Sequence, residues 1–185
     1  MPIINLTCVE GALGADDKAR LAQKLTETLI AMEGGADTRG GRAFAHVIFN
    51  EVRRENWWVG GACDDRYVDP PGRFLAHVTI PEGYMNSAHK DEVHAWIHAA
   101  IVGVVGGEQA APTQSVLTVI DEVPEGNWGA GGRRIGMDSI AGVVGLAHAD
   151  RLAWTRAYFE AKARARATAG YPADTGGLLS SDPHR

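Results

Sequence analysis

Two stretches of this chain decide its fold: residues 51–61 read EVRRENWWVGG, and residues 122–132 read EVPEGNWGAGG. They share Glu-Val, Asn-Trp and Gly-Gly at the same internal spacing. Upstream, VEG at residues 9–11 corresponds to PEG at residues 81–83, and Lys18 corresponds to Lys90. Because self-similarity at a fixed spacing is the mark of a supersecondary unit used more than once, the sequence predicts two copies of one motif.

Each copy has the pattern of a strand, a helix and a second strand. In copy one, residues 3–9 are apolar and β-branched, as in a strand. Apolar residues then recur at helical spacing from residue 15 to the glycine pair at 34 and 35, and residues 44–52 predict the second strand. Copy two repeats the plan at residues 74–80, about 87–105, and 116–123. The glycine pair at 60–61 permits the positive φ of a tight hairpin.

A strand-helix-strand unit places its two strands parallel and covers one face of them with the helix. Two units joined by the linker at residues 69–72 therefore predict an α/β (α+β) fold, a four-stranded sheet with both helices on one face. The other face, on which we expect Ile3, Phe49 and Leu75, must be buried elsewhere. Self-association, with several sheets facing a common centre, is the expected solution.

The repeats leave a C-terminal region. We divide the chain into copy one (2–68), copy two (73–145) and a region at 146–185. Residues 147 to about 167 predict a helix that packs on a neighbour, and the stretch from 171 is typical of a frayed tail. We expect this helix to have an apolar stripe of Leu152, Trp154, Tyr158 and Ala161. Its basic residues are expected to face outward, namely Arg151, Arg156, Lys162, Arg164 and Arg166.

Composition excludes several classes of protein. The chain has 185 residues and a net charge of −5, which argues against a nucleic-acid partner. It has no apolar run of about 20 residues and no signal-peptide pattern, so we expect no membrane partner. Its two cysteines, Cys8 and Cys63, favour a reducing compartment, with the cytoplasm as the default.

The start of the chain (MPII), the VEG segment and both NWxxGG segments resemble the 4-oxalocrotonate tautomerase group of the tautomerase superfamily, here fused in two copies. The resemblance covers roughly residues 2–145. It implies a β-α-β fold, a trimeric assembly for fused members, and a free proline amine that transfers protons on small keto or enol acids. Pro2 becomes that amine once Met1 is removed.

The chemistry of Pro2 can also be argued from its amine. An α-amino group titrates near 7.7 to 8.0, and burial or a nearby cation lowers its pKa toward neutrality. A group with a pKa near the working pH is an efficient general acid and base. The alternative is that proline merely suits the first residue of a strand. Phe74, aligned with Pro2, carries an ordinary amide, so each chain holds at most one such site.

The sequence departs from the family at its substrate-binding arginines. One position is Ala12 in copy one and Tyr84 in copy two, and the other is His46 in copy one and Leu117 in copy two. The diacid substrate of the namesake enzyme is therefore not expected. The relatives that dechlorinate cis-3-chloroacrylate use a helix histidine where this chain has Leu29, so dehalogenation is disfavoured too.

Other residues can bind a carboxylate. The family's site aromatic corresponds to Trp57 and Trp128, with plain packing as the alternative role for Trp57. The candidate cations are Arg39, Arg42, Arg133 and Arg134, with surface solvation as the alternative for each. His46 is either a substrate donor or an interface histidine.

The sequence thus predicts a cofactor-independent tautomerase of small 2-oxo or unsaturated carboxylic acids, without a metal. Pro2 is the predicted catalytic residue, and the predicted substrate-binding residues are Trp57, His46, Arg42 and Trp128. A homotrimer is expected. Two alternatives stay open: a hydratase or decarboxylase with a protonated Pro2, and a noncatalytic oligomeric binding protein of the same fold.

Overall fold

The computed structural model describes residues 2–32, 37–106, 113–136, 139–140 and 149–172. Its sheet has the order β2-β1-β3-β4, with strands β1 (Ile3–Val9), β2 (His46–Val52), β3 (Phe74–Pro81) and β4 (Val116–Val123). The two strands of each copy are parallel, and the copies meet through antiparallel β1 and β3. The predicted fold of two fused β-α-β units is confirmed.

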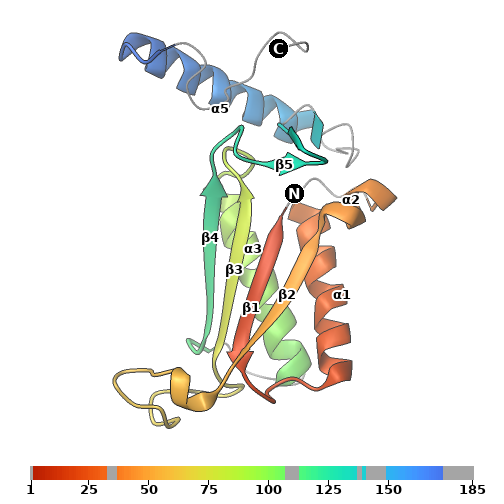
Figure 1. The fold of residues 1–185 in the computed structure, drawn as a ribbon, viewed down its shortest axis with the longest axis vertical. Helices are drawn as coiled ribbons and strands as arrows, with labels where there is room; N and C mark the ends of the chain where they lie inside the picture. The colour runs from red at the N-terminus through yellow and green to blue at the C-terminus, as the bar shows by residue number, and fades with distance from the viewer. Residues whose placement is uncertain (1, 33–36, 107–112, 137–138, 141–148, 173–185) are drawn as a thin grey trace.

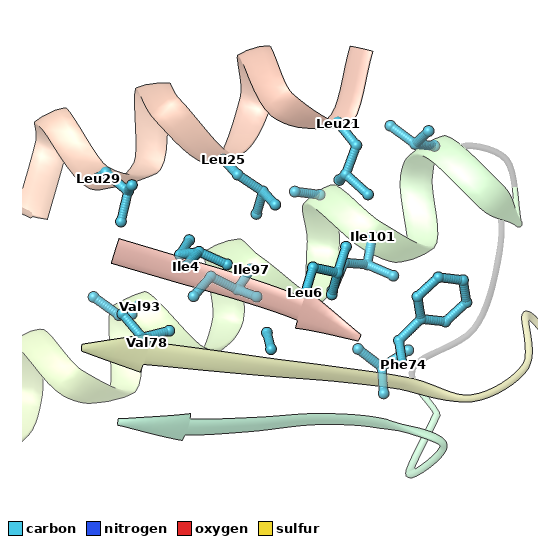
Figure 2. Packing of buried hydrophobic residues seen from close by; sticks show 14 of the residues in the cluster. Ile4, Leu6, Leu21, Leu25, Leu29, Phe74, Val78, Val93, Ile97 and Ile101 are labelled. Atoms are coloured by element: carbon cyan, nitrogen blue, oxygen red, sulfur yellow. The ribbon is translucent and has the colours of Figure 1, made fainter. Parts of the chain in front are cut away.

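Helices α1 (Ala15–Met32) and α3 (Ser87–Val105) lie side by side on one face of the sheet (Figure 1). Their inward side chains meet alternate residues of the two central strands, as Figure 2 shows. The fully buried members of this core include Ile4, Leu6, Leu21, Leu25, Leu29, Val78, Ile97 and Ile101. Burial of this apolar surface is the main force that holds the helices to the sheet.

The repeat in the sequence is a repeat of contacts. In copy one, the Nζ of Lys18 lies 2.9 Å from Oε2 of Glu51, whose Oε1 accepts the N–H of Gly11 at 3.3 Å. In copy two the same roles belong to Lys90, Glu122 and Gly83. Each lysine thus ties the first turn of a helix to the end of the second strand of its copy.

Both glycine pairs form hairpin turns as predicted. Gly60 and Gly61 have φ of 56° and 80° between the bridged residues Val59 and Ala62. Positive φ at both central residues is the backbone of a type I′ turn. The second pair, 131–132, joins the short strands β5 (Gly129–Ala130) and β6 (Arg133–Arg134) in the same way.

Two expectations about copy one are wrong. The second strand begins at His46, because residues before it form the short helix α2 (Arg39–Phe44), capped by the Oγ1 of Thr38. Phe49 does not lie on the uncovered face, since it packs against the core on the helix side together with Val47. The glycine pair at 34–35 lies outside the described residues.

Helix α5 (Ala149–Thr168) is present, but its packed face differs from the predicted one. Thr155 and Phe159 are buried, whereas Trp154 and Ala161 are exposed. Lys162 does not face outward, because it pairs with Glu82. Residues 141–148 and 173–185, and the side chains of Arg151 and Leu152, lie outside the described part. Neither α5 nor any other helix of the described residues is long and apolar enough to cross a membrane.

Candidate functional site

The sheet has two ends that differ in the residues they gather. At one end β1 and β2 begin and β3 and β4 finish, which we call the Pro2 end. At the other, β1 and β2 finish and β3 and β4 begin, which we call the Trp57 end. The seven residues of β1 separate the two by about 20 Å, at roughly 3.3 Å per residue.

Pro2 is buried at the start of β1. Its carbonyl accepts the backbone N–H of His46 at 3.3 Å, which fixes it against the first residue of β2. Its burial continues the alternation along β1, where Ile4, Leu6 and Cys8 are fully buried on the helix side. Burial of this kind disfavours the charged form of an amine.

His46 lies beside Ile3 in the parallel ladder, but its side chain is exposed on the uncovered face of the sheet. Side chains alternate along a strand, and the next residue, Val47, packs on the helix side. His46 therefore points to the uncovered face of the sheet, whereas Pro2 is buried on the helix side. This placement favours the interface alternative.

Trp57 follows the single-turn helix η1 (Arg54–Asn56) at the opposite end of the sheet from Pro2. Its carbonyl accepts Nη1 of Arg73 at 2.9 Å. Arg73 is buried and also reaches Asp65, with Nη2 3.0 Å from Oδ1. Within one chain, the structure does not bring Trp57 and Pro2 together.

Trp128 is the counterpart of Trp57 in copy two, and it lies at the Pro2 end. It follows β4, which finishes at that end of the sheet, as Trp57 follows β2 at the other end. Figure 1 agrees, because β5, which follows Trp128 directly, lies beyond the end of the sheet at which β1 begins. The indole Nε1 of Trp128 is buried and has no hydrogen-bond partner among the described residues. This donor is available to a ligand.

The candidate cations lie at the same end but are exposed. Arg42, in α2, donates through Nε and Nη2 to both oxygens of Asp37, at 2.6 and 2.8 Å. That bidentate pair lowers the pKa of Asp37 and leaves little of the guanidinium fork for a substrate. Arg39, Arg133 and Arg134 are exposed as well.

One polar cluster at the Pro2 end escaped the sequence analysis. Tyr158 on α5 donates its hydroxyl to Oε1 of Glu82 at 2.6 Å, and Lys162, one turn later, pairs with the same oxygen. Burial raises the pKa of Glu82, but the bonds from Lys162 and Tyr158 outweigh it, so the pKa is lowered. The bond to Glu82 raises the pKa of Tyr158 to about 12. The i, i+4 spacing of Tyr158 and Lys162 is visible in the sequence, but their common partner is not.

The comparisons with known proteins identify the fold. Residues 75–137, within copy two, match the family model of the tautomerase enzymes. A fused 4-OT solved as an asymmetric trimer (F6) is 22% identical with a TM-score of 0.58, and 71% of this chain covers 94% of it. A member of the cis-3-chloroacrylic acid dehalogenase family (N1) is 20% identical with a TM-score of 0.57, covering 72% of this chain and 82% of that one.

The macrophage migration inhibitory factor of Toxoplasma gondii is 14% identical with a TM-score of 0.52, covering 72% of this chain and 99% of that one. No curated protein matches the sequence. The fold is thus that of the tautomerase superfamily, with two β-α-β copies in one chain, and the expected resemblance is confirmed.

Proposed function

We propose that this protein is a cofactor-independent tautomerase in which Pro2, freed by removal of Met1, carries protons between the carbon and oxygen of a small 2-oxo or unsaturated carboxylic acid. The observation that supports it best is the place of Pro2, buried immediately before β1 in a fused tautomerase fold. The second copy offers no rival amine, because Phe74 begins β3 within the chain.

The proposed mechanism needs a neutral amine near pH 7. Burial of Pro2 favours the neutral secondary amine, which can remove a proton from the enol oxygen or the α-carbon. The resulting cation then returns the proton to the other atom. The hydrogen bond from the backbone of His46 holds Pro2 in register with β2 while the proton moves. The buried Nε1 of Trp128 is the proposed donor to the substrate's carbonyl oxygen.

We propose a homotrimer as the working assembly. The uncovered face of the sheet carries exposed apolar side chains: Ile48 (45%), Leu117 (55%) and Val119 (44%). Fused 4-OT structures of similar fold are trimers. In such an assembly Trp57 can reach a Pro2 site only from a neighbouring copy, and His46 lies in the interface. Because Cys8 and Cys63 are both free, we place the protein in a reducing compartment such as the cytoplasm.

A protonated Pro2 defines the second candidate function. Glu82 is ionised at the same end of the sheet, and a nearby negative charge favours the cationic form of an amine. A cationic proline protonates a carbon while water adds elsewhere, which gives hydration or decarboxylation. The two functions depend on the same ionisation, that of Pro2, but need opposite protonation states, so the rate should change with pH in opposite directions.

The test is the ketonisation of phenylenolpyruvate, followed from about pH 5 to about pH 9 for wild type and Pro2→Ala, after mass spectrometry has confirmed that Met1 is absent. A rate that rises through one ionisation near neutrality and falls about 10²–10⁴-fold in the variant supports the tautomerase. A rate that falls through that ionisation supports the protonated proline. An inactive wild type, or an equally active variant, rejects both.

A further inference from the structure

Helix α5 is fastened to the turn that follows β3. Phe159 is 1% exposed, and a Cβ placed on Gly83 would lie 3.3 Å from its ring and 2.5 Å from that of Tyr158. Tyr158 and Lys162 meet on Glu82, the residue before that glycine. The absence of a side chain at Gly83 is what allows the helix to approach so closely.

This turn belongs to the Pro2 end of the sheet. Ile3 pairs with Thr79, so the continued register places Pro2 opposite Ile80, two residues before Glu82. Figure 1 shows α5 lying across this end of the molecule, beyond β5 and the tips of β3 and β4. The similarity covers 94% of a fused 4-OT but only 71% of this chain. This chain therefore has residues beyond the shared fold, and α5 can be one of these additions.

The ammonium group of Lys162 is well suited to bind an anion here. It has three donors, and its described partners are one oxygen of Glu82 and the ring of Tyr158, whose centroid is 5.9 Å from Nζ. The side chain is 23% exposed, so a ligand can reach it, while solvent screens it less than a surface lysine.

The cluster also contains a polar atom that the described residues do not satisfy. Oε2 of Glu82 is buried without a hydrogen-bond partner, as is Nε1 of Trp128 at the same end. Buried polar atoms are normally paired, and the two need different partners. Nε1 of Trp128 is a donor that a carboxylate can satisfy, whereas Oε2 of Glu82 is an acceptor that needs a donor such as water. Glu82 itself holds the lysine in position.

We propose that α5 forms the roof of the Pro2 site and that Lys162 binds the carboxylate of the substrate, taking the part of the absent arginines. The inference rests on the proposed function for the identity of the substrate, a small 2-oxo or unsaturated acid. Arg42 is less suited to this role, because both of its described bonds go to Asp37. The lysine supplies a point charge, and Trp128 supplies a directed donor.

The test compares Lys162→Met with Arg164→Met, a matched change on an exposed face of the same helix. Lys162→Met is expected to raise the KM for phenylenolpyruvate about 10- to 100-fold with kcat changed less than about threefold, because the loss is one charge-assisted hydrogen bond. Lys162→Arg should recover most of it. Binding of 3-phenylpropanoate, measured by calorimetry, should weaken to the same extent, and binding of its neutral amide should not change.

A second pair of variants tests the roof without altering a charge. Gly83 and Gly11 both have φ of +78°, but a Cβ on Gly11 meets nothing within 4 Å. Gly83→Ala and Gly11→Ala therefore carry the same backbone strain, and only the first pushes α5 away. Gly83→Ala should raise KM and weaken 3-phenylpropanoate binding, whereas Gly11→Ala should do neither. This pair decides the matter if Lys162→Met fails to fold.

The inference and the proposed function can fail separately. Pro2→Ala should lose activity and still bind 3-phenylpropanoate through Lys162. Carboxylate binding that depends on Lys162 in an inactive wild type would reject the tautomerase and keep the anion site. An active enzyme whose KM and carboxylate affinity are the same in Lys162→Met and Arg164→Met overturns the inference, as does a wild type that binds no carboxylate.

Discussion

The hydroxyl of Tyr158 lies 2.6 Å from Oε1 of Glu82, and this bond joins residues 76 positions apart in the chain. It ties the C-terminal helix to the first residue after β3, at the end of the sheet where the chain begins. The same carboxylate holds Lys162. Glu82 is therefore the residue through which an element outside the repeats is attached to copy two.

The attachment of α5 should weaken in acid. The folded pKa of Glu82 lies below its ordinary value of 4.5, so its contribution is complete above about pH 4.5 and is lost as the pH falls through the folded pKa. We expect Glu82→Gln to lower the free energy of unfolding by about 1–3 kcal/mol at pH 7 and by much less near pH 3. Urea unfolding at several pH values measures this difference.

The control for that experiment is Glu160→Gln, which removes an exposed carboxylate of α5 that lies 3.9 Å from Arg164. It should change the free energy of unfolding by less than about 0.5 kcal/mol at every pH. A Glu82→Gln difference that persists unchanged into acid would mean that packing, and not the charge, attaches the helix.

The helices and strands of the two repeats could be predicted from the sequence. The short elements and contacts outside the repeats could not. Strands β1 and β4 and helix α3 have the predicted bounds, because apolar runs end at clear turn residues. Helix α2 was missed because two of its six residues are glycines, which disfavour a helix. The cap from Thr38 helps to offset the helix-disfavouring effect of the two glycines, but a cap of this kind is not enough to predict a helix from sequence alone.

The site shows the same division. Pro2 and Trp128 belong to the two β-α-β copies, so their place at the ends of predicted strands follows from the sequence. The cluster of Glu82, Tyr158 and Lys162 depends on how a helix with a mixed surface docks on a turn. Phe159 was not assigned to the predicted stripe, because its burial reflects the missing side chain of Gly83. Such a fit is decided by tertiary packing and leaves no periodic signal.

Arg73 should be the costliest charged side chain to remove at the Trp57 end. Its side chain is 2% exposed, and it donates to the carbonyls of Trp57, Cys63 and Asp64 as well as to Asp65. Arg73→Met removes all four of these bonds, and its acceptors are only partly buried, so we expect a loss of about 2–3 kcal/mol in the free energy of unfolding. Chemical denaturation followed by circular dichroism measures it.

Arg54 provides the comparison, since it pairs with the same Asp65 at 2.7 Å while its own side chain is 53% exposed. Arg54→Met should cost less than about 1 kcal/mol. If the two variants were equally stable, the buried bonds of Arg73 would contribute nothing beyond an ordinary surface pair.

The cap of α3 should matter for the whole fold, and the cap of α2 only locally. Oδ1 of Asn86 accepts the N–H of His89 at 2.9 Å, and Oγ1 of Thr38 accepts that of Gly41 at 3.0 Å. Asn86→Ala should lower the free energy of unfolding by about 1 kcal/mol, because α3 carries much of the core. Thr38→Ala should leave it nearly unchanged and speed amide exchange within α2. The reverse order would mean that α2 is part of the cooperative core.

The uncovered face of the sheet should control assembly. Val119 is 44% exposed there, opposite His77 on β3, whose ring contacts Asp121 on β4. Val119→Glu adds a second carboxylate on the face that carries Asp121 and the exposed Leu117, and burying it against a neighbouring copy should cost enough to dissociate an oligomer. Trp96→Glu is the control, because Trp96 is 38% exposed on α3, on the opposite side of the sheet. Sedimentation velocity should show a trimer for wild type and Trp96→Glu and a folded monomer for Val119→Glu. A trimer that survives Val119→Glu would place the contacts between copies on another surface, and the helix side would then be the first to examine.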